Sequence, residues 1–455
     1  MNFAILSFII GFILQFEALF LLLPWIVGMI YGEYHVALIY LATAVVCFIL
    51  GKLLSFRHTG RFKELYVREG FTAVALGWFV MSVFGAIPFV LTGEIPFYID
   101  ALFETISGFT TTGSSILSDV EALSYASLFW RSFTHWIGGM GVFVFIMAIL
   151  PMMGGSTMNL MRAESPGPSV SKLVPRVRDT AKILYGLYMA ITVLGVIMLC
   201  LCGMPLFDSL CTTFGSVGTG GFGIKNSSIG GYSPLIQNAV TVLMILSGVN
   251  YTVYFCLLSR QFKEAFSIEE VRWYFAIFGI ASILITLDLT HNASELLHNL
   301  NLATFQVASV MTTTGYATAD FNLWPTFSKN ILVMLMFVGA CAGSTGGGIK
   351  VSRLIIYIKS SIREVSHLIH PRSVKVVKMD DKAVSDETIR TTHMYLIVYM
   401  FIFAASLFLL SLDKHDMVTN FTAIAATLNN IGPGSSRTDG RLWRIFRVVK
   451  AGYDL

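Results

Sequence analysis

One short element occurs four times in this chain, and its spacing constrains the fold more than any other feature of the sequence. Each copy is an apolar stretch that ends in a small polar tripeptide closed by glycine. The four copies are Asp100–Gly113, Asp208–Gly221, Leu302–Gly315 and Thr419–Gly432. Their closing glycines lie 108, 94 and 117 residues apart. The chain is therefore a fourfold array with a period near one hundred residues.

The composition is that of an integral membrane protein. Hydrophobic residues make up 55% of the chain and charged residues 13%, whereas soluble domains carry about a quarter charged residues. A spanning helix needs about 20 apolar residues. Segments of that kind are Phe3–Ile30, Val36–Phe56, Phe71–Leu91, Leu128–Met152, Lys182–Cys202, Leu235–Leu258, Val271–Leu287, Phe327–Ile358 and Met394–Leu412.

The order of these segments predicts an all-α membrane protein with pseudo-fourfold symmetry. The first two spans precede every repeat and form an N-terminal helix pair. After them a span, a half-span with its tripeptide and another span recur, so each repeat is expected to be one pore unit. The expected divisions are the helix pair at 1–60 and the repeats at 61–155, 156–265, 266–365 and 366–455, the last of them incomplete.

Basic residues predict the orientation of the chain. Lys and Arg gather in the loops between the repeats, whereas the opposite loops hold few, namely Lys225, Lys329 and Lys414. Cytoplasmic loops carry the excess of positive charge, so the tripeptides are expected to face the outside. The same basic loops are also candidates for docking a cytosolic partner.

Other classes of protein are disfavoured. The six cysteines show no paired spacing that would suggest a disulfide framework or a zinc site. No nucleophile triad or metal-ligand helix is visible, so an enzyme is not expected.

The four tripeptides have the chemistry of a cation filter. A filter replaces the hydration shell of an ion with backbone carbonyls, and glycine reaches the positive-φ conformation that such a strand needs without steric cost. The C-terminal end of each half-helix carries partial negative charge, which favours a cation. A lone copy would be a turn or a helix-packing site, but four copies in register favour a filter. The predicted K⁺ ligands are Thr111, Thr112, Gly113, Thr219, Gly220, Gly221, Thr313, Thr314, Gly315, Asn430, Ile431 and Gly432.

A glycine-rich segment after the third tripeptide is a candidate gate. Gly339–Lys350 holds five glycines in its first ten residues, and each glycine costs about 1 kcal/mol in a helix interior. The span should therefore break into a flexible loop below the filter, where the Lys350 cation would repel an ion in a closed pathway. The alternative is a packed kink from which Lys350 snorkels. The predicted gate residues are Gly343, Ser344, Thr345, Gly346, Gly347, Gly348 and Lys350.

Three isolated polar residues carry weaker signals. Glu104 and Asp320 lie near the first and third tripeptides, and each fits a structural acid as well as an ion-attracting one. His135 is expected to be a packing residue rather than a ligand.

Five segments carry a family resemblance. They are Ser107–Leu117, Trp130–Val142, Thr312–Pro325, Gly339–Arg353 and Asn429–Gly434. With them the chain resembles the pore-forming subunits of the Trk/Ktr/HKT potassium-transporter superfamily, most closely the bacterial Trk type. The resemblance implies potassium uptake across the bacterial cytoplasmic membrane, with the K⁺ ion as the bound species and the loop of the third repeat as the gate. It also implies a homodimer and a cytosolic nucleotide-binding regulatory ring on the basic loops.

The end of the chain departs from that family. After Gly434 the sequence is basic and too short to span, so the fourth repeat is expected to lack its second helix. Arg441 is only a weak match for an arginine that the family places near the gate. Two alternatives stay open: a secondary carrier with broken helices, working as a cation-coupled symporter, and a truncated product that does not conduct. Four repeats in one orientation favour the pore.

Overall fold

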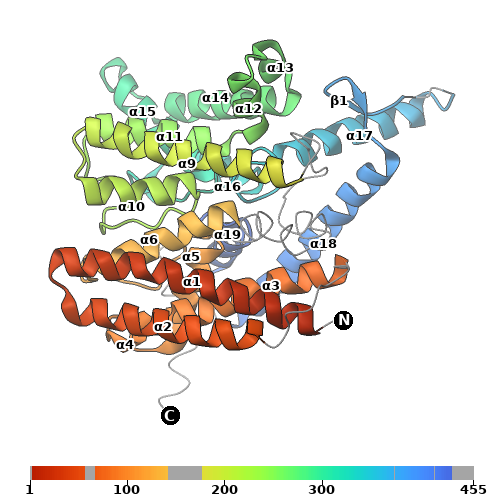
Figure 1. The fold of residues 1–455 in the computed structure, drawn as a ribbon. Helices are drawn as coiled ribbons and strands as arrows, with labels where there is room; N and C mark the ends of the chain where they lie inside the picture. Colours follow the sequence, from red (N-terminus) through yellow and green to blue (C-terminus); the bar gives the residue numbers. More distant parts are fainter. Residues whose placement is uncertain (1–2, 57–66, 142–176, 373–374, 414–415, 433–455) are drawn as a thin grey trace.

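The fold is almost entirely helical (Figure 1). The structure is a computed structural model, and it describes residues 3–56, 67–141, 177–372, 375–413 and 416–432. Within these residues six helices are long and apolar enough to cross a membrane, and a bent pair adds a seventh span. The long helices are α1 (Phe3–Tyr31), α2 (Tyr34–Phe56), α3 (Val67–Gly85) with its continuation α4 (Ile87–Leu91), α9 (Val177–Leu201), α14 (Glu269–Leu289) and α18 (Asp386–Leu410).

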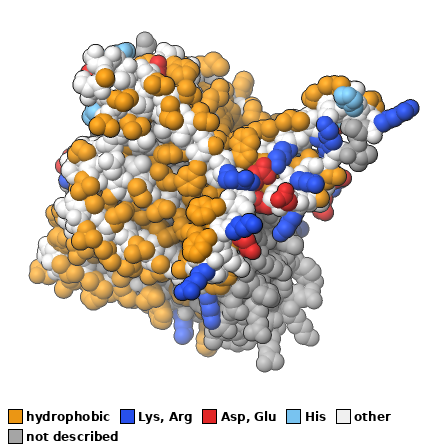
Figure 2. Space-filling view, turned by 90° about the horizontal axis from the view of Figure 1, so that it is seen from above, with side chains coloured by type: hydrophobic (Ala, Val, Ile, Leu, Met, Phe, Trp, Pro, Cys, Tyr) orange, Lys and Arg blue, Asp and Glu red, His pale blue; other side chains and the backbone are white. Residues whose placement is uncertain are grey.

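Figure 2 shows hydrophobic side chains over much of the surface of the body, with Lys and Arg gathered on a projecting arm. An exposed apolar surface of that extent suits contact with lipid rather than with water. The prediction of an all-α membrane protein is confirmed.

The N-terminal helix pair is packed at backbone distance. A Cβ placed on Gly11 would lie 2.7 Å from Gly51 O, and one on Gly51 would lie 2.6 Å from Gly11 O. Small residues allow membrane helices to approach this closely. The Gln15 side-chain amide then donates to Gly51 O (3.2 Å) and to Ser55 Oγ (3.0 Å). The pair packs through α1 against α3 and α6 (Tyr125–Met140), and thus supports the first repeat.

Four half-length helices lie inside the bundle. They are α5 (Tyr98–Phe109), α10 (Leu206–Val217), α15 (Leu296–Met311) and α19 (Met417–Leu428). Three of them have 12 residues, which gives a length of about 18 Å against a hydrocarbon core of about 30 Å. They are too short to cross a bilayer, and each ends at one of the four tripeptides.

The second repeat differs from the prediction. We expected one span over Leu235–Leu258, but the structure breaks it into α11 (Pro234–Gly248) and α12 (Tyr251–Leu258), which meet at 92°. Asn250 caps α12, because its side chain accepts a hydrogen bond from the Thr252 amide (2.9 Å). Hydropathy is continuous through this segment, so it does not reveal a capping residue in mid-span.

The third repeat breaks where the glycines predict. Helix α16 (Thr326–Phe337) ends before the loop, and α17 (Val351–Ile369) begins after it. Helix α17 projects from the body as the arm seen on the right of Figure 1. A two-stranded hairpin, β1 (Lys378–Met379) and β2 (Lys382–Ala383), connects it to α18. Short helical segments complete the fold: α13 (Phe262–Ser267), η2 (Ala293–Glu295), η3 (Phe321–Leu323) and η4 (Ser411–Asp413).

Several predictions fall outside the described residues. The span Leu128–Met152 is described only as far as Gly141. The prediction that the fourth repeat lacks its second helix refers to residues after Gly432, which lie outside the described part of the chain. Arg441 lies there as well. Lys414 also lies outside the described part of the chain.

Candidate functional site

The four pore helices end in the same way. In α5 the Thr112 amide donates to Ser107 O (2.8 Å) and the Thr111 amide donates to Gly108 O (3.0 Å). This pair of bonds is the Schellman ending of a helix, which places one residue in the left-handed conformation. The same long-range bond recurs from Gly220 to Gly215, from Thr314 to Ser309 and from Ile431 to Ala426, at 2.7 to 2.9 Å.

Each tripeptide alternates in backbone handedness. The first residue has positive φ in all four: 56° at Thr111, 53° at Thr219, 58° at Thr313 and 57° at Asn430. The closing glycines are also left-handed, at 74°, 74°, 86° and 93° in chain order. The glycines were predicted to need this conformation, but the threonines were not. A left-handed residue with a Cβ costs about 1–2 kcal/mol, and strain of this kind gathers at functional sites.

The four tripeptides meet in one place. A Cβ on Gly113 would overlap Gly220 O, and one on Gly221 would overlap Thr314 O. A Cβ on Gly432 would lie 3.0 Å from Gly113 O. The first segment therefore touches the second, the second touches the third, and the fourth touches the first. Side chains add to the contact between the first and fourth segments, since the Thr112 hydroxyl donates to Asn430 Oδ1 (2.9 Å).

A cavity of about 150 Å³ opens onto all four closing glycines. Its walls include residues that follow the first three tripeptides, among them Ser115, Phe222 and Ala317. The negative ends of four helix dipoles are directed at this region, because every tripeptide directly follows a helix C-terminus. The cavity can therefore accept a cation.

The residue after each of the first three tripeptides contacts a neighbouring repeat. Ser114 donates to Gly432 O (3.3 Å), and the Phe222 ring stacks on His135 with centroids 4.1 Å apart. Tyr316 reaches behind the second segment, where its hydroxyl donates to Thr212 O (3.2 Å). The first three repeats thus each contact a neighbour through the residue that follows the tripeptide.

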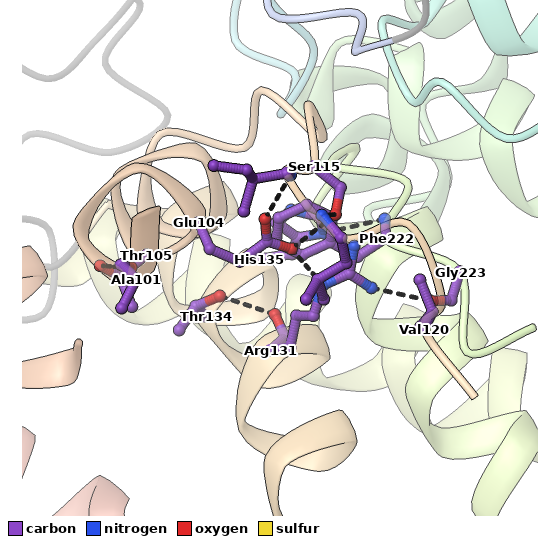
Figure 3. Close-up of polar contacts among 12 residues, drawn as sticks. Ala101, Glu104, Thr105, Ser115, Val120, Arg131, Thr134, His135, Phe222 and Gly223 are labelled. Carbon is purple, nitrogen blue, oxygen red and sulfur yellow. Dashed lines mark hydrogen bonds and ion pairs between the residues drawn. The ribbon is translucent and has the colours of Figure 1, made fainter. Parts of the chain in front are cut away.

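Charged residues support the first two segments from behind (Figure 3). Glu104 on α5 and Arg131 on α6 form a buried ion pair, with Arg131 Nε 2.5 Å from Glu104 Oε1. His135, one turn further along α6, accepts a hydrogen bond at Nδ1 from the Phe222 amide (3.4 Å). We gave Arg131 no role from the sequence, although an arginine inside a span is itself a signal of a buried partner.

The other two isolated residues have structural roles. Asp320 is exposed and caps η3, accepting from the Asn322 amide (2.9 Å). His135 packs beside Gly220, where a Cβ would overlap its ring. Among the described residues no three His, Cys, Asp or Glu side chains are grouped as a metal site would need. All six cysteines are free.

The glycine-rich loop, Gly339–Lys350, lies directly against the tripeptides. The Gly347 amide donates to Thr313 Oγ1 (2.6 Å). A Cβ on Gly347 would lie 2.6 Å from Asn429 O, and one on Gly346 would lie 2.9 Å from Thr312 O. The loop therefore contacts the third and fourth repeats, where any added side chain would collide with backbone.

The loop makes hydrogen bonds to the second repeat in addition to its contacts with the third and fourth. The break between α11 and α12 receives it: Cys341 N donates to Gly248 O (3.0 Å), and Tyr251 N donates to Gly343 O (3.1 Å). Thr345 Oγ1 donates to Ser247 O (3.2 Å). Within the loop, Ser344 Oγ donates to Cys341 O (2.6 Å).

Glu270 at the start of α14 connects the loop to the first turn of α17. Its Oε1 accepts from the amides of Ala342 (2.6 Å) and Ser352 (2.9 Å), and the side chain is buried. Lys350 is also buried and donates from Nζ to Gly346 O, so it does not snorkel. Glu270 was missed because its acidic position at a helix start looked like an ordinary first-turn residue.

Comparisons with known proteins agree with this architecture. The family model described as "TrkH: Cation transport protein" matches residues 39–446. The Trk system potassium uptake protein TrkH of Salmonella typhimurium is 36% identical over 440 residues, which cover 95% of this chain and 91% of that protein. TrkH of Escherichia coli K12 is 35% identical with the same coverage.

A solved structure has the same fold. The crystal structure of the potassium transporter TrkH from Vibrio parahaemolyticus superposes with a TM-score of 0.87 at 29% identity, and the match covers 99% of this chain and 95% of that one. Together with the apolar helices, these relatives make the protein a multi-pass protein of the bacterial inner membrane. The chain belongs to the TrkH family of cation transport proteins.

Proposed function

We propose that this protein takes up potassium across the cytoplasmic membrane through a filter made by the backbone of the four tripeptides. One observation carries the proposal: the same left-handed bend occurs at four helix C-termini that meet at a single cavity. The relatives named as potassium uptake proteins support the choice of ion.

The chemistry of the twelve residues suits a monovalent cation. Alternating backbone handedness turns successive carbonyl groups toward the same side of a strand, where they can replace water around an ion. The twelve residues include no carboxylate, whereas Ca²⁺ sites draw on Asp and Glu. The four helix ends supply negative potential without a fixed charge. Potassium is therefore the proposed cargo, and the site needs no other cofactor.

The proposed gate is the glycine-rich loop. It lies against Thr313 and Asn429 on the side of the third and fourth tripeptides. The buried Lys350 cation next to the pathway opposes the passage of a cation while the loop is in place. Displacement of the loop would open the pathway.

The arrangement favours a pore over a carrier. In a carrier with inverted repeats, two halves of opposite orientation enclose a substrate site. Here all four units present the same C-terminal bend to one cavity. The proposal treats 61–155, 156–265, 266–365 and 366–455 as the four units, with 1–60 as a supporting helix pair.

The proposal includes two assemblies on the cytoplasmic side. Exposed basic residues on the arm and its hairpin, among them Arg372, Lys375 and Lys382, offer a docking surface for a cytosolic nucleotide-binding ring (Figure 2). Exposed apolar residues of α17, such as Ile362 and Leu368, are suited to a homodimer contact.

The test is the ratio of K⁺ to Na⁺ uptake in proteoliposomes for Gly113→Ser. The new Cβ would meet Gly220 O in the neighbouring segment, so the filter must widen. We expect the K⁺ preference to fall by about tenfold, which corresponds to ~1.4 kcal/mol. Gly93→Ser is the matched control, because Gly93 has a similar φ of 78° but nothing within 4 Å of its added Cβ.

An equal ion preference in Gly113→Ser and Gly93→Ser would contradict the filter. If Gly113→Ser fails to fold, the unmodified protein supplies the test. A site that binds K⁺ in the folded state must raise the melting temperature in K⁺ relative to Na⁺ or choline. An identical melting temperature in all three salts would count against the site.

A further inference from the structure

Behind the filter lies an ion pair that the proposed transport mechanism does not use. The side chains of Glu104 and Arg131 are only 1% and 3% exposed, and they face each other across α5 and α6 (Figure 3). Ionised groups inside a membrane protein are expensive to bury and mark functional positions by default. Their remaining partners show what this pair holds.

The carboxylate holds the first filter strand. Glu104 Oε1 accepts from the Ser115 hydroxyl (2.9 Å), and Oε2 accepts from the Ile116 amide (2.9 Å). Ser115 and Ile116 follow Gly113 by two and three residues. Glu104 therefore fixes the strand just beyond its closing glycine.

The guanidinium holds the second filter strand. Arg131 Nη1 donates to Gly223 O (2.8 Å), and the guanidinium carbon lies 3.7 Å from the centre of the Phe222 ring. Phe222 and Gly223 directly follow Gly221. One ion pair thus bridges two filter strands at the same level, with one charge fastened to each strand.

Equivalent positions in the other repeats have no such pair. Nine residues before the closing glycine stand Glu104, Thr212, Gln306 and Ala423 in the four repeats. Arg131 stands seven residues after the N-cap of α6. The same position is Val240 in α11 and Leu332 in α16. At these positions, and among the described residues, an ion pair therefore supports the junction of the first and second strands and no other junction.

We propose that Glu104 and Arg131 are positioning residues that fix the separation of the first and second filter strands and thereby set the preference for K⁺ over the smaller Na⁺. The inference rests on the filter proposed above. Rigid spacing at one junction matters because carbonyls that move inward can coordinate a smaller ion. Arginine suits the task since its planar fork reaches Glu104, Gly223 and the face of Phe222 at once, which a lysine cannot do.

The experiment compares K⁺ and Na⁺ uptake ratios in proteoliposomes for Arg131→Lys and Glu104→Gln. Arg131→Lys keeps the positive charge and loses the fork, so it separates geometry from electrostatics. We expect the ratio to fall by about tenfold in Arg131→Lys, and to fall in Glu104→Gln as well. The control is Glu94→Gln, because Glu94 accepts from the Ser124 amide (2.7 Å) at the start of the same helix α6 without contacting a filter strand.

A second variant keeps the test decisive if Arg131→Lys does not fold. Phe222→Leu removes the ring beneath the guanidinium and changes no charge, so it should lower the ratio in the same direction by a smaller factor. Melting temperatures are measured alongside. Variants that melt earlier but keep the unmodified ratio would show a purely structural pair and would overturn the inference.

Gly113→Ser separates this inference from the proposed function. If Gly113→Ser lowers the ratio while the folded variants of Arg131, Glu104 and Phe222 leave it unchanged, the filter stands and the positioning role fails. If Gly113→Ser also has no effect, the filter assignment itself is wrong.

Discussion

At the scale of single residues, the site depends on side chains in backbone conformations that they normally avoid. Thr111, Thr219 and Thr313 are β-branched and yet left-handed, a combination that is rare outside strained turns. The Schellman bonds of the preceding helices hold them there. Threonine differs from glycine here by offering a hydroxyl group. At Thr313 that hydroxyl accepts a hydrogen bond from the Gly347 amide of the gate loop.

This contact gives a prediction for Thr313→Val. Valine keeps the shape of the side chain but leaves the Gly347 amide without its acceptor. The lost hydrogen bond costs about 1 kcal/mol or more, so the equilibrium between the bound and the released loop shifts roughly fivefold toward release. Basal K⁺ leak in proteoliposomes should rise accordingly. Thr219→Val is the control, because the Thr219 hydroxyl bonds only to Gly218 O of its own turn. Equal leak in the two variants would show that the contact does not restrain the loop.

At the scale of elements, the gate is a broken helix held in a second broken helix. The glycine content of 339–348 predicted the first break, because glycine weakens a helix wherever it lies. The second break, between α11 and α12, was not predicted from hydropathy, since the segment that contains Ser247, Gly248 and Asn250 is still apolar enough as a whole to be one span. The contact between the two breaks depends on tertiary packing and leaves no local signal in the sequence.

Glu270 provides the prediction at this scale. Glu270→Ala removes an anionic acceptor from two amides at once, and each such bond is worth about 1.5–3 kcal/mol. We expect a larger basal leak than in Thr313→Val, while Glu270→Gln should be intermediate because its amide oxygen still accepts. Glu269→Gln is the control: Glu269 pairs with Lys359 (2.6 Å) at the partly exposed arm and not with the loop. A Glu270→Ala protein whose basal K⁺ leak equals that of the unmodified protein would refute the anchoring role.

The candidate site was predictable to the extent that it is repetitive. Four copies of one short pattern revealed the tripeptides, and the glycine content of 339–348 revealed the loop. What the sequence could not show is how the strands are held. Arg131 and Tyr316 lie 92 and 104 residues from the backbone oxygens of Gly223 and Thr212 that they bind, so these contacts emerge only from the packing of one repeat on the next.

At the scale of the whole molecule, the orientation predicted from basic residues places the filter outside and the arm inside the cell. This can be tested by cysteine labelling in a background without native cysteines. His291 lies in an exposed loop on the side of the tripeptides, and Arg372 lies at the exposed end of the arm. The two test variants are His291→Cys and Arg372→Cys. A membrane-impermeant maleimide should label the first in intact cells and the second only after permeabilisation. The reverse pattern would invert the proposed direction of transport.

The central claim is that backbone oxygens from four quarters of one chain surround one dehydrated alkali ion. Anomalous diffraction from crystals grown in Rb⁺, a heavier substitute for K⁺, tests it most directly. The account predicts an anomalous peak among the tripeptides that end at Gly113, Gly221, Gly315 and Gly432, and its loss when Rb⁺ is replaced by Na⁺. An ordered map with no peak there, or with Rb⁺ bound only elsewhere, would contradict it.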